Sequence, residues 1–215
     1  MRGRLGFAKT LMFGEFGRPQ LHTFPNRQYS REVRCRHLLN GELREVIPWW
    51  ISALRTVSER KTMVCDRTVV IYVDAAGCGH IGAKVFMGGH EYAFSPHTPA
   101  RMESGNADVY DFEMTASLFG VSLAAVLCPG RPVILRCDNM AESQTLVRGP
   151  CKTSTGRMLC ARFWTVAATF GVPVWVASVA GTLNHSDPPT RDCTICNLRM
   201  LKLNGAKSRV FFSML

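Results

Sequence analysis

Acidic residues and long hydrophobic runs are both scarce in this sequence. Its 215 residues contain 16 Asp and Glu against 26 Lys and Arg, which gives a net charge of +10. No apolar run approaches the roughly 20 residues that a bilayer-spanning helix requires. The composition is 47% hydrophobic, without a low-complexity tract. We therefore expect a globular chain that does not act in a membrane and has enough apolar residues for a substantial core.

The sequence also lacks a secretory signal, a second CxxC motif and an even number of cysteines. Three of its nine cysteines, Cys128, Cys137 and Cys160, lie within apolar stretches. This is typical of reduced, buried thiols in an intracellular protein. Cys193 and Cys196 form a single CxxC, which by itself does not predict a zinc site. The role of this pair stays open.

The first 31 residues are basic, with six Arg or Lys and one acid, Glu15. Mitochondrial presequences have such a composition. Here, however, Gly14, Gly17, Pro19 and Pro25 interrupt any long amphipathic helix. We therefore expect a cytoplasmic or nuclear protein and treat mitochondrial targeting as the lesser alternative.

The excess of positive charge is distributed along the whole chain rather than gathered in one tail. Such a distribution suits contact with a polyanion over a broad surface, and nucleic acid is the commonest partner of that kind. Plain solubility accounts for the same charge. The charge alone does not decide between the two.

Three parts are expected along the chain. Residues 1–66 form a basic, partly helical extension, with twelve Arg or Lys against six acids. Its one clear helix covers about residues 43–57 and includes Trp49 and Trp50, and we expect Pro48 to kink or restart it. Residues 67–192 form an α/β domain, and residues 193–215 form a C-terminal tail.

Regular alternation of strand and helix patterns begins at Arg67. Gly88-Gly89 is typical of a hairpin between the second and third strands. The expected strands are 69–74, 80–87, 91–94, 132–137 and 173–179, and the expected helices are 108–127, 139–147 and 155–170. The order βββαβααβ predicts a mixed five-stranded sheet with helices on both faces.

Two acids directly follow apolar strands, at the end where each strand stops. Asp74 ends VVIYVD and Asp138 follows PVILRC. Ligands bind at the carboxyl ends of parallel strands in open α/β sheets. Glu113 lies on the small-residue stripe of the expected helix 108–127, and Asp187 lies in GTLNHSDPPTR after the last strand. Each acid alone has an ordinary explanation as a surface, boundary or turn residue.

The four acids together are a different matter. They would form an oxygen-only site, which favours Mg²⁺ or Mn²⁺ over Zn²⁺. Two such ions about 4 Å apart can activate a water and stabilise the leaving oxygen of a phosphodiester. A metal would also explain why the apolar strand 69–74 ends on a charge, since a buried, unpaired carboxylate is costly.

Four stretches resemble the type 1 ribonuclease H domain found at the end of retroelement reverse transcriptases: IYVDAAGCGHIGA, DFEMTASLFG, LRCDNMAESQTLVRG and GTLNHSDPPTR. The resemblance covers residues 67–192. Residues 14–60 are similar, more loosely, to the connection that follows the polymerase. The resemblance implies a ribonuclease H-like fold and cleavage of the RNA strand of an RNA·DNA hybrid. No YxDD polymerase motif occurs, so a polymerase domain would be a partner absent from this chain.

The resemblance also implies roles for individual residues. Asp74, Glu113, Asp138 and Asp187 match the family's four acids, with spacings of 39, 25 and 49 residues. They would hold two Mg²⁺ ions, with Mn²⁺ as an alternative. His185 and Asn184 are auxiliary candidates beside Asp187.

Nucleic-acid contacts are expected from polar and basic residues around the same elements: Arg136, Asn139, Arg148, Lys152 and Arg157. RNA would be selected through its 2′-hydroxyls across the minor groove. Other functions stay open: an inactive binding module of the same fold, an integrase, transposase or exonuclease of the wider superfamily, or a scaffold.

Overall fold

A computed structural model describes residues 5, 16–21, 23–24, 39–56, 68–96, 108–149, 151 and 153–191. Lys152 and the tail 193–215, with Cys193 and Cys196, lie outside the described residues, so their assignments stay predictions. The strands are β1 (Val69–Ala75), β2 (Ile81–Met87), β3 (His90–Phe94), β4 (Val133–Cys137) and β5 (Val174–Ser178). The helices are α2 (Arg18–Leu21), α4 (Gly41–Thr56), α6 (Val109–Leu127), α7 (Met140–Arg148), α8 (Ser154–Thr169), the 3-10 turn η1 (Gly181–Leu183) and α9 (Asp187–Arg191).

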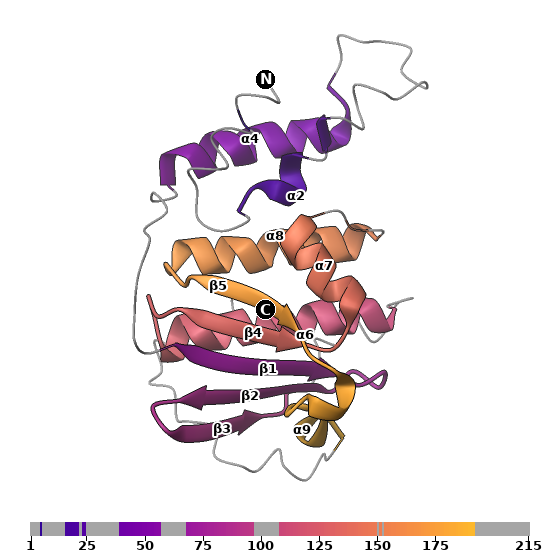
Figure 1. Cartoon of the computed structure of the whole chain (residues 1–215). Helices are drawn as coiled ribbons and strands as arrows, with labels where there is room; N and C mark the ends of the chain where they lie inside the picture. Colours follow the sequence, from indigo (N-terminus) through magenta and orange to yellow (C-terminus); the bar gives the residue numbers. More distant parts are fainter. Residues whose placement is uncertain are drawn as a thin grey trace.

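The five strands form one mixed sheet in the spatial order β3-β2-β1-β4-β5 (Figure 1). β1 pairs antiparallel with β2. β2 pairs antiparallel with β3, and the Gly88-Gly89 turn joins these two strands with positive φ at both glycines. β1 pairs parallel with β4, and β4 with β5. The order βββαβααβ and the mixed five-stranded sheet are therefore confirmed, with strand and helix bounds within one or two residues of those predicted.

Helices lie on both faces of the sheet. α6 covers the face that carries Ile71, Val73 and Leu135, and α8 packs along α6. Gly120 allows this close approach, because a Cβ there would lie 2.7 Å from Val73 Cγ1. On the opposite face, α9 packs over β2 at Gly82, where a Cβ would lie 2.6 Å from the Ser186 carbonyl oxygen. The prediction of helices on both faces is confirmed.

The basic extension packs beside the α/β layer. Trp50 of α4 is 1% exposed and belongs to the same hydrophobic core as the sheet, while Trp49 packs against Phe16. Pro48 was expected to kink or restart the helix; the helix does not restart there, since α4 runs unbroken from Gly41 to Thr56, and the kink stays a prediction. Pro48 lies on the exposed side of α4, where water can hydrogen-bond the carbonyl that Pro48 leaves without a donor.

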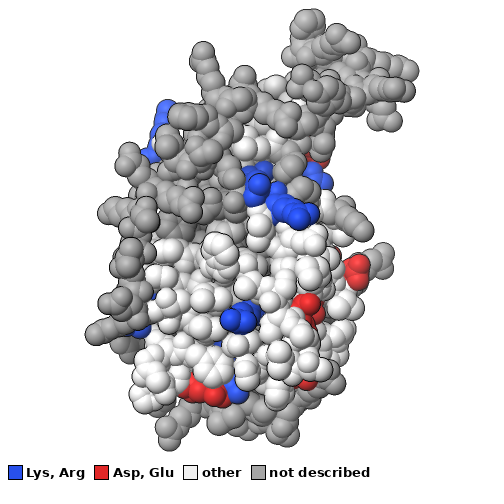
Figure 2. Space-filling view, viewed as in Figure 1, with Lys and Arg blue, Asp and Glu red and all other residues white. Residues whose placement is uncertain are grey.

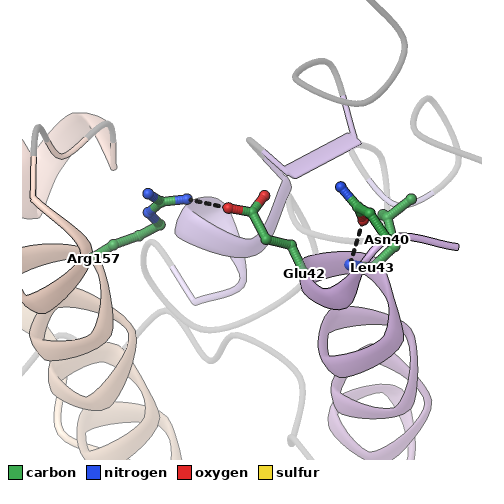
Figure 3. Close-up of polar contacts among 4 residues, drawn as sticks. All are labelled: Asn40, Glu42, Leu43 and Arg157. Atoms are coloured by element: carbon green, nitrogen blue, oxygen red, sulfur yellow. Dashed lines mark hydrogen bonds and ion pairs between the residues drawn. The ribbon is translucent and has the colours of Figure 1, made fainter. Parts of the chain in front are cut away.

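Two polar contacts define how α4 begins and how it meets α8 (Figure 3). Asn40 Oδ1 accepts a hydrogen bond of 3.0 Å from the Leu43 amide, which caps the helix. Glu42 forms an ion pair of 3.3 Å with Arg157 of α8. Residues 115 positions apart therefore join the extension to the α/β layer.

Among the described helices, α6 alone is long and apolar enough to cross a bilayer by length and composition. In the fold, 89% of that apolar stretch is buried. A helix that lies between a sheet and a second helix needs apolar residues on every side, which explains its composition.

Candidate metal centre

The carboxyl ends of two neighbouring parallel strands carry the first two acids. Asp74 is the sixth residue of β1, and Asp138 follows the last residue of β4. Because β1 and β4 are parallel and adjacent, the two acids reach the same end of the sheet, where α9 also lies (Figure 1).

Glu113 approaches these two acids from the second turn of α6. One ligand oxygen from each of Asp74, Glu113 and Asp138 lies within 4.8 Å of the other two. Asp74 and Glu113 are 7% exposed, and Asp138 is half-buried. The sequence-based prediction that these three residues share one site therefore agrees with their positions.

The three carboxyl groups repel one another in a poorly solvated place. Burial, followed by the charges of Asp74 and Asp138, raises the pKa of Glu113 to about 8. Burial is also the largest cause that raises the pKa of Asp74, and the charges of Asp138 and Asp187 add to it. Nearby like charges disfavour ionisation. A cation bound between the three carboxyl groups would therefore stabilise their charged forms.

Asp187 lies close enough to Asp74 for its charge to raise the Asp74 pKa, but it is outside the group of three within 4.8 Å. Asp187 is the first residue of α9. This helix packs on Gly82, and Gly82 of β2 is paired with Asp74 of β1. Thr190, on the same short helix, lowers the Asp74 pKa through its side chain. Thr190 was not predicted as a site residue.

The two auxiliary candidates occupy different places. Asn184 is buried, donates a hydrogen bond of 3.1 Å to the Val73 carbonyl, and accepts one of 2.6 Å from the Ser186 hydroxyl. It therefore holds the loop before α9 against β1. His185 is exposed, and its ring meets Tyr72 edge-on, with ring centroids 4.7 Å apart.

The described residues among those predicted to contact nucleic acid lie on β4, at the two ends of α7 and on α8. Arg136 lies over the Tyr72 ring, 5.7 Å from its centroid. Asn139 caps α7 by accepting bonds from the Ala141 and Glu142 amides, as its position after β4 suggested. Arg148 ends α7, about 13 Å along that helix from its start, and Arg157 pairs with Glu42.

On the face shown in Figure 2, one group of Lys and Arg side chains lies right of centre, below the grey residues, while other Lys and Arg side chains lie apart from it. Most of the described surface on this face belongs to neither basic nor acidic residues. The individual nucleic-acid contacts stay predictions.

The donor set suits a hard divalent cation. The three clustered groups are all carboxylates, with neither nitrogen nor sulfur among their ligand atoms, and such sites favour Mg²⁺ or Mn²⁺. Among the described residues, no basic side chain forms an ion pair with Asp74, Glu113 or Asp138. The residues present therefore fit a bound cation.

The strand order and the helix positions form a mixed five-stranded α/β fold, which agrees with the ribonuclease H-like fold that the sequence resemblance implies. No known family model and no curated protein matches the sequence. Solved structures that share similarity include the N-terminal RNase H domain of Rv2228c from Mycobacterium tuberculosis, determined as a fusion with maltose-binding protein. It is 19% identical, with 55% of this chain and 86% of that chain covered and a TM-score of 0.43.

A second similar structure is RNase H1 from the halophilic archaeon Halobacterium salinarum. It is 13% identical, with 56% of this chain and 89% of that chain covered and a TM-score of 0.43. Neither likeness determines what this chain does, so the function has to be argued from its own residues.

Proposed function

We propose that this chain is a cation-dependent endonuclease that hydrolyses the RNA strand of RNA·DNA hybrids. The observation that carries the proposal is the convergence of Asp74, Glu113 and Asp138 within 4.8 Å at the carboxyl end of the sheet. Three buried or half-buried carboxylates that have no basic partner among the described residues would destabilise a fold. Their retention at one place is best explained by cation binding.

The three clustered acids would hold the cation, and Asp187 would add charge from α9. Bound Mg²⁺ ions, or Mn²⁺ in their place, would activate a water and stabilise the leaving oxygen of a phosphodiester. The chain's own contribution is to fix the carboxylates: β1 and β4 set Asp74 and Asp138, α6 sets Glu113, and Asn184 anchors the loop that leads to Asp187.

The choice of an RNA·DNA hybrid as substrate, and the origin of the chain in a retroelement, are finer parts of the proposal. They are supported by the stretches DFEMTASLFG, LRCDNM and GTLNHSDPPTR. In that origin, a polymerase domain would be the natural partner. Contacts to 2′-hydroxyls and phosphates would be independent of base sequence and sensitive to salt.

The test is cleavage of a hybrid labelled on either strand by the full chain in Mg²⁺, compared with Asp74→Asn. Asp108→Asn is a matched control, because Asp108 is exposed and its side chain caps nothing at the start of α6. We expect RNA-strand cleavage by the wild type and the control, and a loss of about 100-fold or more in Asp74→Asn.

Other outcomes would redirect the proposal. Salt-sensitive hybrid binding without cleavage would favour an inactive binding module of the same fold. Cleavage of the DNA strand instead would point to another nuclease of the wider superfamily. If the wild type neither binds nor cleaves the hybrid, the proposed function is wrong for this chain.

A further inference from the structure

A fifth acidic side chain lies behind the metal centre and was not among the predicted site residues. Glu142 is on α7, four residues after Asp138, and it is 0% exposed. Neither of its carboxyl oxygens has a hydrogen-bond partner of normal geometry among the described residues. A glutamate is almost never fully buried unless it is paired, so this position requires an explanation.

The neighbours of Glu142 come from α6 and β4. Burial, followed by the charge of Glu113, raises the Glu142 pKa well above its ordinary value. Ser117 of α6 and Cys137 of β4 lie beside the carboxyl group and lower that pKa. No basic side chain is among these neighbours. The charge of Asp138 also raises the Glu142 pKa, so Glu142 lies near two of the three clustered acids, Glu113 and Asp138.

Two further buried oxygens near Glu142 also lack a hydrogen bond of normal geometry to any described residue: Oε2 of Glu113 and Oγ of Ser117. Ser117 follows Glu113 by one turn of α6, so the two side chains lie on the same side of the helix. Buried polar atoms in folded proteins are hydrogen-bonded with few exceptions. Four such oxygens together therefore indicate a shared polar arrangement rather than four separate defects.

We propose that Glu142 and Ser117 are positioning residues of the cation site, which hold the inner oxygen Oε2 of Glu113. Glu113 then presents a fixed carboxyl group toward Asp74 and Asp138. This inference rests on the cation site of the proposed function. Groups that orient metal ligands in this way change metal affinity by about 10- to 100-fold when they are removed.

The test measures Mn²⁺ affinity by calorimetry on the full chain without nucleic acid. Glu142→Leu removes the carboxyl group, Glu142→Gln keeps a hydrogen-bonding group of the same size, and Ser117→Ala removes the hydroxyl. We expect about tenfold weaker binding for Glu142→Leu, about threefold for Ser117→Ala, and a change within about threefold for Glu142→Gln. Circular dichroism and thermal unfolding check that each variant is folded.

Two controls match the chemistry of these changes. Ser122 is also buried on α6, but its hydroxyl donates to the Leu118 carbonyl at 2.8 Å. Glu45 is an exposed glutamate of α4. Ser122→Ala and Glu45→Gln should bind Mn²⁺ as the wild type does. If Glu142→Gln keeps the Mn²⁺ affinity that Glu142→Leu loses, the hydrogen-bonding group at this position matters and not only the volume of the side chain.

A folded Glu142→Leu variant with wild-type Mn²⁺ affinity would overturn the inference. If that variant does not fold, wild-type affinity in Ser117→Ala would overturn it instead. A wild type that binds Mn²⁺ but leaves hybrids intact would disprove the proposed function and leave this inference standing. A wild type that binds no Mn²⁺ would disprove both.

Discussion

The two halves of α6 are buried to a similar degree but are built from different residues. The first half carries Asp111, Glu113, Thr115 and Ser117, all 7% exposed or less. The second half, from Leu118 to Ala125, is apolar apart from Ser122. One helix therefore combines a polar half that serves a site with an apolar half that serves the core.

The polar half is itself of two kinds. Asp111 is satisfied, since its side chain accepts a hydrogen bond of 3.0 Å from Thr153 at the start of α8. Glu113 is not, since its Oε2 has no partner. We infer that the apolar half supplies the stability that allows Glu113 to stay unpaired at the cation site.

The largest effect is expected from Glu113→Gln in the polar half. Cation-dependent cleavage should fall by about 100-fold or more, because a ligand charge is lost. Stability should change in the opposite direction. At pH 8 without divalent cations, the free energy of unfolding should rise by about 1 kcal/mol, since the amide carries no charge to bury. Urea unfolding and hybrid cleavage measure the two effects. A variant that loses both stability and cleavage would contradict the difference between the two halves of α6.

In the apolar half, Gly120→Val should affect stability most. A Cβ at Gly120 would lie 2.7 Å from Val73 Cγ1 and 3.0 Å from Leu135 Cδ1, and all three positions are buried. Overpacking at such a contact costs about 3 kcal/mol, which urea unfolding would show. Gly41→Ala is the control, because a Cβ there has nothing within 4 Å. Wild-type stability in Gly120→Val would mean that α6 and the sheet can move apart.

The pH dependence of stability reports on the polar half. The folded chain keeps the Glu113 proton up to about pH 8, whereas the ordinary pKa is 4.5. Between these values the folded state binds more protons than the unfolded chain, so the free energy of unfolding should fall as pH rises. A fall of about 4 kcal/mol is expected in chelator, because each pKa unit corresponds to about 1.4 kcal/mol. Asp74 and Glu142, whose pKa values are also raised, act in the same direction.

Two additions sharpen that measurement. Glu113→Gln should make the pH profile less steep between pH 4.5 and 8, because it removes one of the three acids whose pKa values are raised. Millimolar Mg²⁺ should flatten it in the wild type, because a bound cation favours the ionised acids. A wild-type profile that rises over this range would mean that Glu113 is not a buried, unpaired acid.

The sequence was sufficient to predict the sheet, because its strands are apolar runs closed by glycine or proline and its helices alternate with them. It also placed Asp74 and Asp138 together, since residues that end neighbouring parallel strands must meet. Glu113 followed from the small-residue stripe on which it lies. These inferences need only local pattern and topology.

Other features depend on tertiary contacts that no local pattern contains. A glutamate in the first turn of a short helix is normally a solvated residue that favours the helix dipole, so the burial of Glu142 was not foreseen. The ion pair of Arg157 with Glu42 joins parts of the chain that are far apart in the sequence, so no local pattern predicts it. The sequence predicts a turn around Asp187, whereas the structure has the short helix α9 there. Pro188 and Pro189 lie at the start of this helix, where prolines are tolerated.

The smallest effects are expected from removing single hydroxyl groups, one that contacts the polar half of α6 and one that lies in its apolar half. Thr153 donates to Asp111 and accepts from the Gly156 amide as the cap of α8, so Thr153→Ala should cost about 1 kcal/mol. Ser122 donates only to its own helix at Leu118, and alanine is the better helix former, so Ser122→Ala should stay within about 0.5 kcal/mol of wild type. Urea unfolding of both variants at one pH measures the difference. If both variants lose the same free energy of unfolding, the burial of a hydroxyl group would account for the loss. The hydrogen bond from Thr153 to Asp111 would then add nothing to it.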